Sequence, residues 1–136
     1  GYQKGVCFYC GTTVSVIAGS PTLADVDHLI PHCLKEHLAP VNLNGVWNLV
    51  LACRDCNRGQ GGKSDSLPNI KFAVQLHDRN EYYISSHHPL GETIINQTGK
   101  SREDRRGFLN DVWNDAYALR ATPRFWEPEE GGLEGI

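Results

Sequence analysis

The sequence predicts an α+β protein, in which a metal-stapled half of short strands is followed by a helical half. Two Cys-x-x-Cys pairs and short β-branched runs occur before residue 66, and apolar residues at helical spacing follow it. A length of 136 residues favours a single folded unit. We expect residues 1–66 to form a zinc-stapled core, residues 67–126 to pack on it as a helical extension, and residues 127–136 to be a disordered tail or linker.

The first half is expected to contain short strands separated by loops. The segment VCFYCGTTV (6–14) predicts a cysteine knuckle that opens a hairpin. The runs VSVI (14–17) and ADVDHLIP (24–31) each predict a short strand, the second of which ends at its proline. We expect a helical turn at 32–37, and the apolar run at 46–53 leads into the second knuckle.

The second half is predicted to form three helices. The first helix lies between Pro68 and His88, and a short helix then ends at Gly99. Ser101 is the expected N-cap of the last helix. That helix carries an apolar stripe, which we expect to pack in the core and which consists of Phe108, Leu109, Val112, Trp113, Ala116, Tyr117 and Leu119.

Four of the five cysteines follow the pattern of a structural zinc site. Each Cys-x-x-Cys pair has the spacing at which two thiolates bind one zinc ion, and such short pairs are poor disulfide partners. We therefore expect Zn²⁺ on Cys7, Cys10, Cys53 and Cys56. The alternative is that these are redox-active or unrelated cysteines. Cys33 is left over and is expected to be a small buried residue.

The composition limits the classes of protein that the chain can represent. No apolar run approaches the length of a membrane helix, so we expect a soluble, cytoplasmic protein. The 13 Lys and Arg residues against 16 Asp and Glu residues give a net charge of -3, so nucleic-acid binding would need a local basic cluster or another domain. A hydrophobic share of 40% leaves a thin core that a metal would help to hold. A start at Gly1 fits a trimmed start codon or a fragment of a longer protein, and we favour the fragment.

An acidic residue and a histidine, Asp27 and His28, are adjacent between the two knuckles. A carboxylate can bind a hard cation, and an imidazole can accept a proton near neutral pH. Neighbouring side chains on a strand face opposite sides, so the pair can converge only at a bulge or a strand end. Pro31 predicts such an end.

Three segments in this order resemble a known family. The segments CFYC (7–10), DVDHLIP (25–31) and WNLVLACRDCNRGQGGKSD (47–65) are similar to the HNH endonucleases of the ββα-metal, or His-Me finger, class. DVDH and NRG…KSD are especially similar to the HNH domain of RNA-guided CRISPR effector nucleases. The resemblance covers about half of the chain. It implies a ββα-metal nuclease core with zinc knuckles, in a larger bacterial or phage-defence protein.

The resemblance implies a role for each matching residue. His28 matches the general base that activates the attacking water, and Asp27 and Asn57 match the ligands of one catalytic Mg²⁺ or Mn²⁺. Many relatives have histidine where this chain has Asn57. Asn48 matches the asparagine that holds the active-site loop and orients the base. The implied reaction is hydrolysis of DNA phosphodiester bonds to 5′-phosphate and 3′-hydroxyl ends, with RNA also open.

The second knuckle runs directly into a polar, glycine-rich and basic stretch. We expect the knuckle to fix where the helix of Asn57 starts, opposite Asp27. Arg58 and Lys63 are expected to contact phosphates of the substrate. His32 lies close enough in sequence to assist.

Two interpretations from different classes follow. The first is a metal-dependent endonuclease, which other domains or subunits would supply with substrate because its own charge is weak. The second is a non-catalytic, zinc-stabilised module that binds nucleic acid. Such a module has no chemical need for the set formed by Asp27, His28, Asn48 and Asn57.

Overall fold

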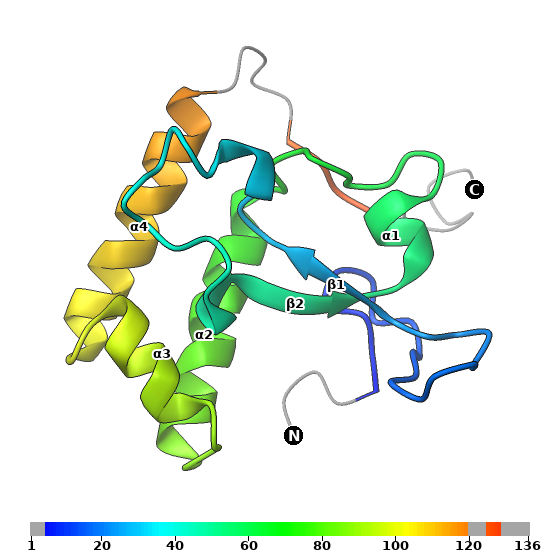
Figure 1. Cartoon of the computed structure of the whole chain (residues 1–136), viewed down its shortest axis with the longest axis horizontal. Helices are drawn as coiled ribbons and strands as arrows, with labels where there is room; N and C mark the ends of the chain where they lie inside the picture. The colour runs from blue at the N-terminus through cyan, green and yellow to red at the C-terminus, as the bar shows by residue number, and fades with distance from the viewer. Residues whose placement is uncertain (1–4, 120–124, 129–136) are drawn as a thin grey trace.

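The computed structural model describes residues 5–119 and 125–128 and shows a small two-stranded sheet with helices beside it (Figure 1). The α+β class is confirmed. No helix among the described residues is long and apolar enough to cross a membrane. In chain order the elements are β1 (Asp25–His28), the 3-10 helices η1 (His32–Leu34) and η2 (Val46–Asn48), β2 (Leu49–Ala52), α1 (Arg54–Arg58), α2 (Ile70–Ser85), α3 (Gly91–Thr98) and α4 (Arg102–Ala118).

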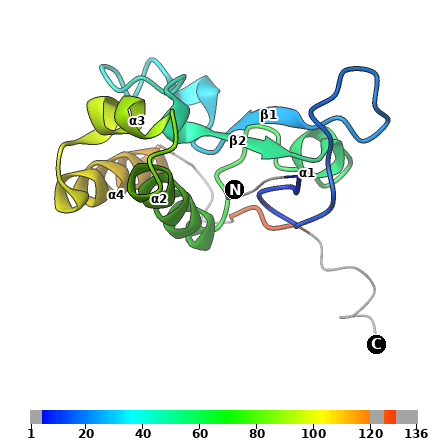
Figure 2. The same ribbon diagram turned by 90° about the horizontal axis from the view of Figure 1, so that it is seen from below.

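The molecule has two distinct ends. Figure 2 shows α2, α3 and α4 grouped at one end, and the sheet with α1 and the N-terminal loops at the other. The described helices α2, α3 and α4 contact one another, and α2 and α3 also contact η2. The helical end therefore supports the segment that leads into β2.

Strands β1 and β2 pair antiparallel, with Asp27 opposite Val50 and His28 opposite Leu49. Partners across an antiparallel pair point to the same face of the sheet. Val50 is buried, so Asp27 faces the interior, whereas His28 lies on the outer face and is half-buried. The two side chains thus leave β1 on opposite sides and do not converge, and the strand ends at His28, before the expected end at Pro31.

The predicted strand at 14–17 is absent. Ser15 makes one isolated bridge with Leu23, and Val16 and Ile17 are each 72% exposed. β-branched residues favour a strand only where a continuous neighbouring strand and a packed face are present, and here only Val14 is buried and the bridge is a single residue pair. The knuckle hairpin is confirmed by a bridge between Val6 and Thr13.

The helical half agrees with prediction at its boundaries. The side chain of Ser101 caps α4 by accepting the N–H of Asp104 at 3.0 Å, and Gly99 ends α3 with a φ of 146°. The apolar stripe of α4 is buried from Leu109 to Ala116. Its last two members are wrong as core residues, because Tyr117 and Leu119 are 45% and 43% exposed. Tyr117 lies in the last turn of α4, where it stacks on Phe125, and Leu119 is the residue that follows the helix.

Arg79 of α2 ties the helical end to the sheet. It is 4% exposed, and its guanidinium donates to the carbonyl oxygens of Leu49 at 2.6 Å, Val46 at 3.1 Å and Trp47 at 3.2 Å. These are the backbone groups of η2 and the start of β2, which stand next to β1.

The segment 125–128 returns to the sheet end. Trp126 forms a bridge with Pro68, and its indole N–H donates to the carbonyl oxygen of Gly61 at 2.8 Å. Glu127, which we expected in a disordered tail, pairs with Lys71 at 2.7 Å. The rest of the predicted tail, 129–136, lies outside the described residues.

Candidate active site and metal centre

The four cysteines of the two knuckles meet at one point. Their sulfur atoms all lie within 4.8 Å of one another, and Cys10 and Cys53 are 3.8 Å apart. A tetrahedral zinc ion with Zn–S bonds of about 2.3 Å separates its sulfurs by about 3.8 Å. The described cysteines form no disulfide. The cluster could therefore hold a metal ion such as zinc.

Backbone N–H groups point at these sulfurs, as they do in metal knuckles. Cys7 Sγ accepts the N–H of Tyr9 at 3.3 Å, and Cys53 Sγ accepts that of Cys56 at 3.4 Å. Burial raises the pKa of the Cys10 thiol, but its hydrogen bonds with Thr12 outweigh burial and bring the pKa to about 7. Burial, and then the charge of Cys7, raise the pKa of Cys56. A central dication would stabilise all four thiolates together.

Cys33 departs from expectation, because it is exposed. It lies in η1, where Leu34 is the buried residue. A single 3-10 turn directs few side chains to the core, and Leu34 takes that position.

Asp27 lies in a closed polar environment on the inner face of β1. It is 7% exposed, and its Oδ2 accepts the hydroxyl of Tyr9 at 2.6 Å. The ammonium of Lys63 lies 3.2 Å from Oδ2 and 3.5 Å from Oδ1, and it also donates to the carbonyl oxygen of His28 at 2.8 Å. Burial, and then the charge of Asp27, raise the pKa of Tyr9 well above its usual value. The phenol is therefore the neutral donor of this pair.

The position of Lys63 corrects the expectation that it contacts phosphate. The residue is fully buried, so its ammonium cannot reach an exposed substrate in this arrangement. Its charge neutralises Asp27 instead.

His28 is held from the loop that precedes η2. Its Nε2 lies 2.8 Å from Oδ1 of Asn44, and its ring is 4.8 Å from that of His32. Because a carbonyl oxygen only accepts, Nε2 carries a proton in this pair, and in the neutral ring the free electron pair is then on Nδ1.

Asn48 is fully buried and holds the chain that follows His28. Its Oδ1 accepts the N–H of Ile30 at 2.8 Å, and its amide donates to the carbonyl oxygens of Ile30 at 3.0 Å and Leu43 at 2.9 Å. One side chain therefore fixes both the segment after β1 and the loop that carries Asn44.

Asn57 lies elsewhere than expected. Helix α1 begins at Arg54 with Cys53 as its N-cap, so Asn57 is in the last turn and does not start the helix. Its amide donates to Oδ2 of Asp25 at 3.0 Å, and Nε of Arg58 donates to the same oxygen at 2.9 Å. The structure thus brings Asn57 and Arg58 to Asp25 and shows no direct contact between Asn57 and Asp27.

Three residues of the site were not predicted. Asp25 shares the face of β1 with Asp27, and the alternation in DVD could have indicated this. Tyr9 lies inside the first knuckle, where an aromatic residue is expected only to pack. Asn44 precedes a glycine in the sequence, so its pattern indicates a turn and gives no sign of a contact with His28.

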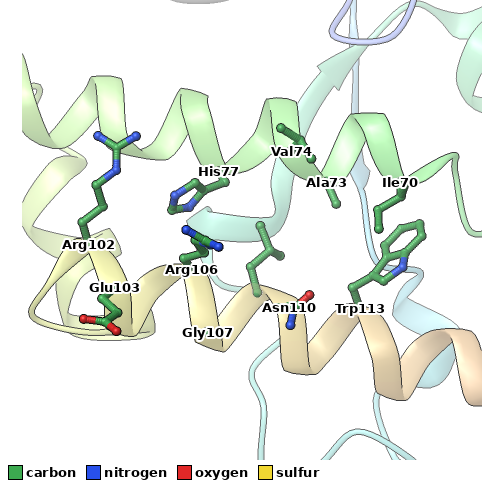
Figure 3. Close-up of a pocket in the computed structure, with 11 residues that line it drawn as sticks. Ile70, Ala73, Val74, His77, Arg102, Glu103, Arg106, Gly107, Asn110 and Trp113 are labelled. Atoms are coloured by element: carbon green, nitrogen blue, oxygen red, sulfur yellow. The ribbon is translucent and has the colours of Figure 1, made fainter.

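A hollow of about 770 Å³ lies between α2 and α4, away from this chemistry (Figure 3). Ala73, Leu109 and Trp113 form part of its apolar lining, and Arg102 and Arg106 are among its charged residues. None of the site residues discussed above lines it.

Comparisons with protein-family models, with curated proteins and with solved structures found no match to this chain.

Proposed function

We propose that the chain is a metal-dependent endonuclease domain, which hydrolyses DNA phosphodiester bonds with an HNH-type, ββα-metal core made by β1, β2 and α1. The observation that carries this proposal is the setting of His28. This half-buried histidine ends β1, has its Nε2 held by Asn44 at 2.8 Å, and directly follows Asp27. Asn48 fixes the backbone after His28, at Ile30, and the backbone before Asn44, at Leu43.

The oxygen donors suit a hard divalent cation. Asp25 and Asp27 leave the same face of β1, and Asn57 contacts Asp25. Carboxylate and amide oxygens are the ligands that Mg²⁺ and Mn²⁺ prefer. Lys63 lies 3.2 Å from Oδ2 and 3.5 Å from Oδ1 of Asp27, so an ion at Asp27 would have to displace this ammonium. A bound ion would stabilise charge on the scissile phosphate and on the leaving oxygen.

The protein side chains supply the remaining chemistry. Nδ1 of His28 accepts the proton of the attacking water, and general base catalysis of this kind contributes about 10²–10⁴-fold in rate. Asn44 keeps the other ring nitrogen protonated. The side chain of Arg58 is 60% exposed, so its guanidinium can contact a phosphate while it pairs with Asp25. In this proposal zinc on the four cysteines is structural.

A partner or a further domain is expected to deliver the substrate. The two basic residues predicted to contact phosphate both neutralise carboxylates: Arg58 pairs with Asp25, and Lys63 pairs with Asp27. Binding through few phosphate contacts is weak and depends steeply on salt. We therefore propose that this domain acts within a larger assembly, of the CRISPR-type or phage-defence class that the motifs resemble.

A second function has one observation in its favour. The carboxylate of Asp27 is already neutralised by Lys63 at 3.2 Å, so the inner face of β1 is complete without a second metal. A non-catalytic, zinc-stabilised module that binds nucleic acid would need nothing more. A plasmid-cleavage assay separates the two functions.

The test is cleavage of supercoiled plasmid at low salt with Mg²⁺ or Mn²⁺. We expect His28→Ala to reduce the rate by about 10²-fold or more, with an unchanged circular dichroism spectrum. His77→Ala is the matched control, because His77 lies in α2 and lines the hollow away from the site. Equal cutting by wild type and His28→Ala would remove His28 as the base. Salt-dependent binding without any cutting would favour the binding module.

A further inference from the structure

The hollow between α2 and α4 has two chemically different ends (Figure 3). At one end Ile70 of α2 lies beside Trp113 of α4, and at the other end His77 of α2 lies beside Arg106 of α4. Among the described residues that line the hollow, only Glu103 is acidic. The hollow is therefore apolar at one end and basic at the other.

The apolar end leaves large side chains in contact with solvent. Ile70 and Val74 lie one turn apart on α2, and they are 50% and 57% exposed. Two aliphatic side chains that are adjacent and this exposed gain free energy when another surface covers them. This end of the hollow thus favours an apolar partner.

The basic end carries charges that the described chain does not neutralise locally. Arg102 and Arg106 lie one turn apart on α4, and both are exposed. Arg102 is the first residue of α4, where the helix dipole disfavours a positive charge. Arg106 makes no ion pair with any residue in the described part of the chain. A carboxylate from outside the chain would complement both guanidinium groups.

Gly107 provides an independent observation at the same place. It lies inside α4 and lines the hollow. Glycine is among the least favourable residues in a helix interior. A Cβ added at this position would meet nothing within 4 Å, so the packing of the described residues does not explain the glycine. A position without a side chain lets another helix approach closely, because the distance between packed helices depends on the side chains at the contact.

We infer that the hollow between α2 and α4 is the docking site for an amphipathic helix of a partner protein, whose apolar residues cover Ile70 and Val74 and whose acidic residues meet Arg102 and Arg106. Binding of an amphipathic helix in an apolar groove is a common mode of recognition. A nucleic acid would match the basic end and leave the apolar end uncovered. The inference goes beyond the proposed function and does not depend on it, because none of the residues assigned to catalysis lines the hollow.

The test uses the full chain and a synthetic helical peptide of about 15 residues, the length at which isolated helices begin to be stable. Leucines form one face of this peptide, with glutamates at one end of that face, and a second peptide has lysine in place of each glutamate. Binding is followed by the amide chemical shifts of the protein. We expect saturable shifts at Val74 and Gly107 with the glutamate peptide, and binding at least about 10-fold weaker with the lysine peptide.

Two variants test the residues that carry the inference. Arg106→Glu should reverse the preference, so that the lysine peptide binds more tightly than the glutamate peptide. Lys35→Glu is the matched control, because it changes the net charge equally at an exposed position outside the hollow, and it should keep the wild-type preference. Gly107→Gln should prevent binding by filling the contact surface, without lowering the melting temperature, since glutamine favours a helix more than glycine does.

Other occupants of the hollow would give different results. No saturable shift with the glutamate peptide, or equal affinity for the two peptides, would overturn the inference. Larger shifts of the same amides with a DNA duplex than with the peptide would assign the hollow to nucleic acid instead. Binding that occurs only in a variant ending at Pro128 would assign it to the glutamate-rich residues 129–136 of this chain, and would also overturn the inference.

Discussion

The sheet end and the helical end of the molecule bury their interiors by different means. The helical end consists of α2, α3 and α4, with 16, 8 and 17 residues, and its apolar faces pack against one another. The sheet end has two strands of four residues and a helix of five, joined by loops. Its interior contains a cysteine cluster and fully buried polar residues, Asn48 and Lys63. The candidate site thus lies where regular structure is scarcest, and its geometry depends on a cysteine cluster that could hold a metal and on buried hydrogen bonds.

Metal removal should have the largest effect and should separate the two ends. Structural zinc contributes about 10–16 kcal/mol of apparent binding free energy, which exceeds or equals the stability of a typical domain. We expect Cys53→Ser, or chelation, to abolish hydrogen-exchange protection in β1 and β2 while α2 and α4 keep most of their helical signal. Cys33→Ser, at an exposed position, should change neither metal content nor protection. Full hydrogen-exchange protection of β1 in metal-free protein would contradict the expectation that the sheet end is stabilised by a metal.

Loss of the Arg79 guanidinium should have the next largest effect, because Arg79 connects the two ends. Arg79→Met keeps the apolar stem but leaves the carbonyl oxygens of Val46, Trp47 and Leu49 without this donor. We expect the free energy of unfolding to fall by about 3 kcal/mol or more, because hydrogen bonds from a charged group to three carbonyl oxygens are lost and each contributes about 1.5–3 kcal/mol. Denaturant unfolding measures this. Arg102→Met, at an exposed position, should stay within about 0.5 kcal/mol of wild type.

The ion pair inside the helical end should have the smallest effect, and it depends on pH. Arg105 donates to Glu81 at 2.6 Å, and this bond lowers the pKa of Glu81, although burial opposes it. A lowered folded pKa gives stability that is present above the unfolded pKa of about 4.3 and is lost as pH falls through the folded value. We expect Glu81→Gln to cost about 1–3 kcal/mol at pH 7 and progressively less below pH ~4. Melting temperatures across pH would test this, and a constant difference between the two proteins would exclude the linkage.

Local signals were sufficient for much of the fold. The caps and the apolar spacing predicted α2 and α4, because amphipathic periodicity depends on the helix itself. The Cys-x-x-Cys pairs predicted the four-cysteine cluster for a similar reason, since two of its sulfurs lie within each knuckle. The strand predicted at 14–17 failed, because strand formation depends on a partner that the sequence does not specify locally.

The site was less predictable, because its contacts join distant segments. Whether Asn57 meets Asp25 or Asp27 depends on where α1 crosses β1, and no local pattern specifies that crossing. The burial of Lys63 depends on the course of the glycine-rich loop before it, and a basic residue after two glycines gives no sign of an interior position. No local pattern predicts the contact of Tyr9 with Asp27, because it forms only when the first knuckle packs against the inner face of β1.

The position of Trp126 bears on how the protein is made. Its ring lies on Tyr9, so one of the last described residues covers one of the first. A ribosome releases the chain in order, and the aromatic wall around Tyr9 is therefore completed only after the segment that contains Trp126 has left the exit tunnel. Contacts of such long sequence separation form late and slowly. Until then one side of the first knuckle is not covered by Trp126. During that time its thiols are most accessible to a metal ion or an oxidant.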